Sequence, residues 1–105
     1  MTAATMAILD GMIEEAIVDA NGESEQVTGL FTMLDEHLAL PFVTSILGVP
    51  VTVTKIALND HDDIVAVCVR DEASQRVSIL DLPLPSPPPA GADWIAAYRR
   101  WARHR

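Results

Sequence analysis

Oxygen-bearing side chains gather in one short segment between residues 19 and 25. In chain order they are Asp19, Asn21, Glu23 and Glu25. Calcium is a hard cation that takes about six to eight oxygen ligands from carboxylates, amide carbonyls and backbone carbonyls. Because Gly22 lets the segment turn, these donors form a candidate calcium site. Asp35 or Glu36 would join it if the second predicted helix folds back along the first.

A second oxygen cluster lies further along the chain, at Asp60, Asp62 and Asp63. Neither cluster is an EF-hand, whose loop needs Gly at its sixth position and Glu at its twelfth. Counted from Asp19, these positions hold Ser24 and Leu30, and the sixth position counted from Asp60 holds Val65. Any calcium site in this chain is therefore of another kind.

Both clusters also have an explanation that needs no metal. Acidic residues in the first turn of a helix are stabilised by the helix dipole by about 0.3–1 kcal/mol each. Asp is frequent in turns because its side chain bonds to nearby backbone N–H groups. A solvated acidic surface therefore stays open as the alternative to a metal site.

Catalytic and zinc-binding patterns are absent from the sequence. The histidines, His37, His61 and His104, fall in unlike segments, and the sequence has no nucleophile elbow, phosphate loop or dinucleotide fingerprint. Cys68 lies within the apolar run Ile64–Val69, which is typical of a buried core thiol. One Cys and dispersed His residues give no zinc-ligand spacing. We therefore expect a binding protein and no enzyme.

The net charge is −8, and the charges are unevenly distributed. No Lys or Arg precedes Lys55, whereas the acids before it are Asp10, Glu14, Glu15, Asp19, Glu23, Glu25, Asp35 and Glu36. Such a surface repels nucleic acid and anionic membranes and attracts calcium or a basic protein surface. The single cysteine and the lack of a signal peptide predict a cytoplasmic protein.

Hydrophobic periodicity predicts helices over residues 5–19 and 23–39, a helical hairpin spanning 5–39. Gly22 is the expected stop of the first helix, and Asn21 or Ser24 the expected cap of the second. Alternating and β-branched runs predict strands at 42–47, 51–56, 64–69 and 76–82. These form a β meander over 42–82, which hides its edges by curling into a small barrel or by packing beneath the helices.

The C-terminal part contains a Pro-rich spacer at 83–90 and a helix predicted over 91–104. Trp94, Tyr98 and Trp101 share one face of that helix, and we expect this face to dock on the rest of the protein. The sequence therefore predicts a single α+β domain over residues 1–105.

The order of several segments resembles the CcbP-type (cyanobacterial) calcium-binding protein family. The matching segments are Ile17-Val18-Asp19-Ala20, Glu25-Gln26, Leu40-Pro41-Phe42 and the late Trp94 and Trp101. The likeness spans about residues 13–102. It implies helices packed on a small barrel-like (SH3-like) antiparallel sheet of four to five strands, with calcium at an acidic surface. It matches Asp19, Glu23 and Glu25 to acidic positions of the link, and Asp35 to an acid on the second helix.

The chain also departs from the family pattern. Asn21 and Gly22 stand where a bulkier and more acidic link is expected, so fewer carboxylates are present and a weaker site is predicted. The resulting hypothesis is a non-enzymatic calcium-binding protein, either a buffer or a low-affinity sensor. Its alternative is a metal-free acidic module that binds a basic protein. The candidate metal ligands are Asp19, Asn21, Glu23, Glu25, Asp35, Asp60, Asp62 and Asp63.

Overall fold

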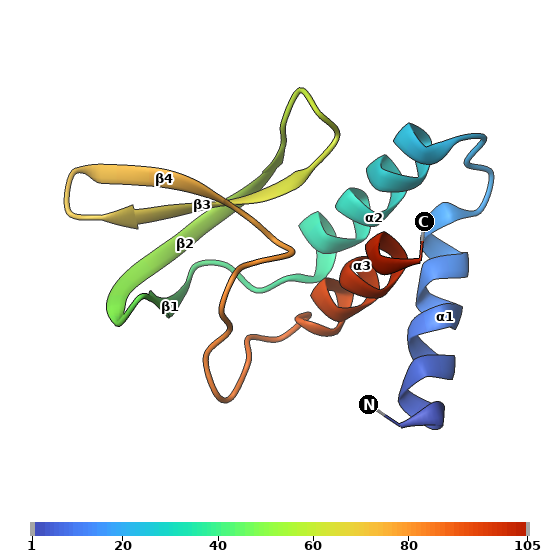
Figure 1. The fold of residues 1–105 in the computed structure, drawn as a ribbon, viewed down its shortest axis with the longest axis horizontal. Helices are drawn as coiled ribbons and strands as arrows, with labels where there is room; N and C mark the ends of the chain where they lie inside the picture. Colours follow the sequence, from blue (N-terminus) through green and yellow to red (C-terminus); the bar gives the residue numbers. More distant parts are fainter. Residues whose placement is uncertain (1, 105) are drawn as a thin grey trace.

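A helical part and a sheet part lie side by side in the computed structural model, which describes residues 2–104 (Figure 1). The helices are α1 (Ala3–Ile17), α2 (Glu23–His37) and α3 (Asp93–Arg103). The strands are β1 (Phe42–Ile46), β2 (Val49–Leu58), β3 (Ile64–Arg70) and β4 (Ala73–Ser78). This arrangement confirms the predicted α+β class, with two helices before the sheet and one after it. No helix of the described residues has both the length and the apolar character needed to cross a membrane.

The strands form one antiparallel sheet in the order β1-β2-β3-β4, so β1 and β4 are its edges. Each neighbouring pair is a hairpin, and the register of β2 on β3 shifts between Val53 and Lys55, which marks a bulge. Four strands agree with the prediction, whereas the barrel-like curvature stays a prediction.

The bounds of β2 and β4 differ most from those predicted, because the turns that precede them are shorter than expected. Leu47 and Gly48 both have positive φ (51° and 76°), so β1 turns at once into β2, which begins at Val49. Asp71 (φ 52°) closes a similar turn, and β4 therefore begins at Ala73 and ends at Ser78. Ile79 and Leu82 leave the sheet but stay buried.

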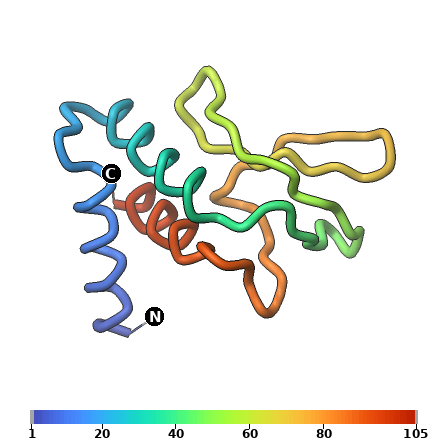
Figure 2. The backbone as a smooth tube through the Cα atoms, turned by 180° about the vertical axis from the view of Figure 1, so that it is seen from behind, coloured from blue at the N-terminus to red at the C-terminus, as the bar shows by residue number. Residues whose placement is uncertain are grey.

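The core joins all three helices to one end of the sheet. Leu30 and Leu34 of α2 are fully buried together with Val53 of β2 and Ile64 of β3. At Gly29, a Cβ atom would overlap the carbonyl oxygen of Ala16, so α1 and α2 approach more closely than any other residue at 29 would allow. Viewed from behind, the helices form one group and the hairpins extend away from it (Figure 2).

The C-terminal helix docks on the protein through the aromatic face that the sequence predicted. Trp94, Tyr98 and Trp101 are all buried. Polar contacts fix the helix further: Arg99 donates from Nε to the carbonyl oxygen of Ile79 (3.0 Å), and Arg100 forms an ion pair with Asp10 of α1 (2.7 Å). Arg99 and Arg100, which lie between Tyr98 and Trp101, thus hold α3 against the segment that follows β4 and against α1.

Candidate functional site

The link between α1 and α2 is shaped by Asp19, which adopts the left-handed conformation (φ 66°). α1 ends at Ile17, and the N–H of Ala20 donates to the carbonyl oxygen of Ile17 (2.9 Å). The expectation that Gly22 stops α1 is wrong, because Gly22 is extended (φ −172°) and is the N-cap of α2. Asp tolerates the left-handed conformation better than most residues, which explains the reversal at position 19.

Glu25 stabilises the start of α2 in place of the predicted side-chain cap. Its Oε2 accepts a hydrogen bond from the backbone N–H of Asn21 (3.1 Å), the residue before the N-cap Gly22, so the side chain reaches one residue further back than in a capping box. The N-cap Gly22 has no side chain to cap with, so the expectation of a cap from Asn21 or Ser24 is wrong. The Glu25 carboxylate is thereby held beside the link.

Asp19 and Glu25 line the same surface hollow, of about 270 Å³, at the C-terminal end of α1. Thr28 contributes to its wall, and Gly29 brings α2 onto the backbone of Ala16 at its base. The last carbonyl groups of a helix lack intrahelical partners and carry the negative end of the helix dipole. The hollow therefore combines two carboxylates with a helix end that favours cations.

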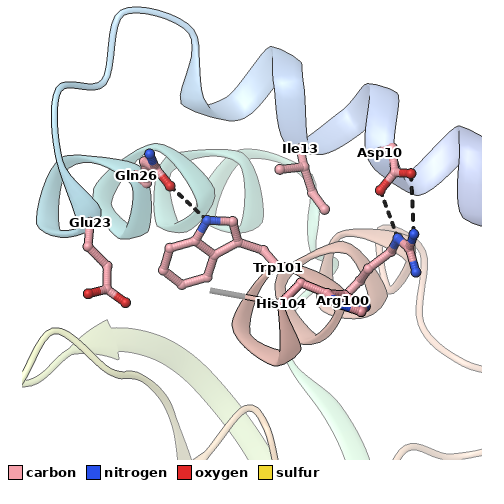
Figure 3. Close-up of a pocket in the computed structure, with 7 residues that line it drawn as sticks. All are labelled: Asp10, Ile13, Glu23, Gln26, Arg100, Trp101 and His104. Carbon is pink, nitrogen blue, oxygen red and sulfur yellow. Dashed lines mark hydrogen bonds and ion pairs between the residues drawn. The ribbon is translucent and has the colours of Figure 1, made fainter.

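Glu23 faces a different hollow, of about 490 Å³, between the three helices. Figure 3 shows its side chain beside Trp101, with the Asp10–Arg100 ion pair at the opposite end. Trp101 donates from Nε1 to the side-chain oxygen of Gln26 (2.9 Å). Arg100 lowers the pKa of Asp10 below its ordinary value of 3.8, chiefly through their hydrogen bond. The polar groups of this hollow thus include the ion pair that joins α1 to α3 and the hydrogen bond that joins α3 to α2.

The remaining candidate ligands near the helices are dispersed. Asn21 is exposed, and its backbone is what Glu25 binds. Asp35 is exposed near the end of α2, ten residues beyond Glu25, which corresponds to about 15 Å along a helix axis. The structure therefore brings Asp19 and Glu25 to one hollow and places Glu23 and Asp35 elsewhere.

The second cluster lies in the turn between β2 and β3, and Asn59 organises it. The Oδ1 of Asn59 accepts from the backbone N–H groups of His61 (2.9 Å) and Asp63 (3.0 Å). Asp62 has φ 60°, a conformation that Asp tolerates, and Asp60 and Asp62 are exposed. The residue types of this turn are thus explained by its backbone geometry.

Within residues 2–104, no three His, Cys, Asp or Glu side chains lie together in a group suited to a metal ion. The hollow at the link offers a smaller set of hard oxygen donors: two carboxylates, the Thr28 hydroxyl and backbone carbonyls. Calcium accepts such mixed oxygen sets and completes its roughly six to eight ligands with water. The donor chemistry therefore fits a low-charge, solvent-rich calcium site.

The histidines and the cysteine lie apart from this hollow. His37 is half exposed and stacks on Trp94 with ring centroids 5.7 Å apart, and His61 is exposed on its turn. Cys68 is buried on β3, and burial raises the pKa of its thiol. A raised thiol pKa suppresses the reactive thiolate.

No sequence pattern assigned a role to Thr28, and Gln26 was named only as part of the family resemblance. Thr28 follows Glu25 by three residues and Gly29 follows it by four, the spacing that places side chains on one helix face. This helical spacing could have predicted that Thr28 and Gly29 lie beside Glu25. Gln26 offered no comparable signal, because its partner, Trp101, is distant in sequence.

The fold is shared with a known structure. No protein-family model matches the chain, and a search of curated proteins finds no match. A solved structure described as a calcium binding protein in the calcium-binding form is similar, with a TM-score of 0.72 and 20% sequence identity. The similarity covers 99% of this chain and 97% of the other. The chain therefore has the same fold as a protein that was solved in a calcium-binding form.

Proposed function

We propose that this chain is a non-enzymatic calcium-binding protein whose ion lies in the hollow at the α1–α2 link. The observation that carries the proposal is that Asp19 and Glu25 line one hollow at the C-terminal end of α1. The shared fold with a calcium-binding protein supports it. The proposal includes membership of the CcbP-type family, a single domain over residues 1–105 and a cytoplasmic location.

In this proposal Asp19 and Glu25 are the charged ligands, and Thr28 and backbone carbonyls supply neutral oxygens. Asn21, Glu23, Asp35 and the acids of the β2–β3 turn act from a distance by raising the local concentration of cations. Few charged ligands and an open hollow imply weak binding, with a Kd of about 10⁻⁴–10⁻³ M. Such an affinity suits a low-affinity sensor or a buffer at high calcium concentration.

Calorimetric titration and thermal unfolding of the metal-free protein test the proposal. With a Kd of about 0.1 mM, 10 mM calcium stabilises the folded state by about 2.7 kcal/mol. For a domain of this length, that corresponds to a rise in Tm of roughly 10 °C or more. If 10 mM calcium produces neither heat nor a change in Tm, the proposal is wrong.

Two substitutions locate the ion while preserving the link. Asp19→Asn keeps a residue that tolerates positive φ, and Glu25→Gln keeps an oxygen that accepts from the Asn21 N–H. Each should weaken calcium binding at least about tenfold, because each removes a charged ligand. Glu72→Gln, in the exposed turn between β3 and β4, is the matched control and should leave the affinity unchanged.

The second candidate function is a metal-free acidic module that binds a basic protein. The observation in its favour is that no group of three metal-ligating side chains forms within residues 2–104, although Glu14, Glu15 and Glu36 are exposed on the helices. Its affinity for a Lys-rich peptide would fall steeply with salt and would be unaffected by a calcium chelator. If calcium binding is the function instead, the chelator would abolish the measured binding.

A further inference from the structure

The end of the sheet that lies away from the helices differs in composition from the rest of the protein. Residues 38–54 contain no Asp, Glu, Lys or Arg, although the chain carries a net charge of −8. This stretch includes β1, the turn at Leu47 and most of β2. Figure 1 shows the β1–β2 and β3–β4 turns at the sheet end remote from the helices.

Leu47 is placed there against two physical preferences. Its side chain is 98% exposed, and its φ is 51°. A bulky residue in the left-handed conformation is strained, and hairpin turns of this kind favour Asn or Asp before Gly. An exposed, strained leucine contributes nothing to folding of the isolated chain, so its place at the tip indicates a contact outside it.

A hollow of about 360 Å³ opens beside Leu47 on the inner face of the sheet. Ile46, Val49, Val51 and Cys68 form an apolar wall, and Ala73, Ser74 and Gln75 of β4 contribute to the lining. The registers of β1 on β2 and β2 on β3 place the side chains of the apolar wall on the face whose other end, at Val53 and Ile56, belongs to the core. The apolar core face thus extends beyond the helices and ends in this hollow.

Charge at the rim favours a partner with the same surface. Arg70 lines the hollow, and its guanidinium donates from Nη1 to the carbonyl oxygen of Pro50 (3.3 Å), which holds the positive charge over the β1–β2 hairpin. The next residues, Asp71 and Glu72, are exposed carboxylates. A surface that carries both signs side by side can pair reciprocally with a copy of itself across a twofold axis.

We infer that two copies of this chain associate through this sheet end, with each Leu47 inserted into the hollow of the other copy. A projecting side chain and a hollow on one patch meet the requirement of an isologous interface, in which the same patch must complement itself. Arg70 of each copy then faces the Asp71–Glu72 turn of the other. The acidic helices α1 and α2 stay at the outer ends of the dimer, away from the contact between the copies.

The two edge strands of the sheet differ in charge. β4 carries Arg76 and follows two acids, a common way to protect a sheet edge from further pairing. β1 has no charged residue; its Val43, which is 57% exposed, pairs with Thr52 and so points to the face opposite the hollow. Both edge strands border the hollow, since β1 contributes Ile46 and β4 contributes Ala73, Ser74 and Gln75, but only the β1 edge is free of charge.

Sedimentation or light scattering of the full chain in EDTA tests the inference. The fraction of dimer should rise with protein concentration between roughly 10 µM and 1 mM, the range of a small interface. Leu47→Asn should weaken the dimer roughly 100-fold or more, because two apolar side chains lose their burial. Asn also suits the left-handed conformation, so the variant monomer should be at least as stable to urea as the wild type.

Ile8→Gln is the matched control, since Ile8 is an exposed apolar residue (65%) on α1, and it should leave the dimer unchanged. A wild-type chain that is monomeric at 1 mM overturns the inference and leaves the hollow for an extended peptide of another protein. A Leu47→Asn variant that dimerises like the wild type, or an Ile8→Gln variant that does not dimerise, also overturns it. Because the measurement is made without calcium, its result is independent of the proposed function.

Discussion

The two acidic segments of this protein look alike in sequence but are built differently. The α1–α2 link places Asp19 and Glu25 around a hollow at a helix C-terminus. The β2–β3 turn places Asp60 and Asp62 on the outside of a hairpin that Asn59 closes. Carboxylates concentrate a cation only when they converge, so the surroundings of each cluster matter more than its number of acids.

The difference has a physical cause in the two kinds of backbone. A helix end leaves carbonyl groups without partners, and packing α2 on α1 brings further oxygens toward them. A tight hairpin turn satisfies its backbone internally and directs its side chains to solvent. The experiments below test this contrast, in order of decreasing expected effect.

Replacing Gly29 with Ala should disrupt the link most strongly. The new methyl group overlaps the carbonyl oxygen of Ala16, so α1 and α2 must separate, at a cost of about 2–4 kcal/mol in the free energy of unfolding. Urea denaturation measures this cost. Gly11→Ala is the control: nothing lies within 4 Å of its Cβ position, and it should stabilise the protein by about 0.5–1 kcal/mol. Equal effects of the two changes would refute the close helix contact.

Removing acids from the two segments should separate their roles in calcium binding. Asp19 and Asp62 both have positive φ (66° and 60°), so Asp19→Asn and Asp62→Asn make the same chemical change in the same conformation. We expect Asp19→Asn to reduce the calcium-induced stabilisation by about 1.4 kcal/mol or more, a tenfold loss of affinity. Asp62→Asn should change it by less than about 0.5 kcal/mol. A larger effect at Asp62 would move the proposed ion to the β2–β3 turn.

Asparagine should matter in the turn and not in the link. Asn59→Ala removes the acceptor of two backbone N–H groups and should cost about 1–2 kcal/mol of stability. Asn21→Ala should cost less than about 0.5 kcal/mol, because Asn21 is exposed and its bond to Glu25 uses its backbone N–H. Thermal unfolding of both variants decides the point, and a costlier Asn21→Ala would contradict it.

The smallest effect concerns pH and the contact between α1 and α3. Arg100 holds the folded-state pKa of Asp10 below its ordinary value of 3.8, so the ion pair stabilises the fold above that pH. The contribution is lost as the pH falls through the lowered pKa. Asp10→Asn should therefore lower the urea midpoint slightly at pH 7 and leave it unchanged in strong acid. Glu14→Gln, on the same helix, is the control and should show no such difference between the two conditions.

Much of the fold followed from local patterns. The helical spacing of Val27, Leu30 and Leu34 predicted α2, and all three side chains are buried. The aromatic face of the last helix was predicted to dock, and it does. Boundaries were missed where a non-glycine residue takes positive φ, as at Asp19 and Leu47, because composition alone does not single out such residues.

The candidate site was predictable only in part. The sequence indicated the α1–α2 link as a concentration of oxygen donors but treated Glu23 and Glu25 as equivalent. In the structure they line different hollows, although only one residue separates them. Residues two apart on a helix point about 200° from each other. A ligand set chosen only from closeness in sequence therefore included both Glu23 and Glu25.

The sequence by itself determined the acidic character of the first two helices, the uncharged stretch at 38–54 and the order of helices and strands, because these depend on residue type and short-range periodicity. Tertiary structure decided which acids line the same hollow, how closely α1 approaches α2 at Gly29, and that α3 is fixed by Arg99 and Arg100. These features join residues far apart in the chain. Their geometry depends on how whole elements pack, which no local pattern encodes.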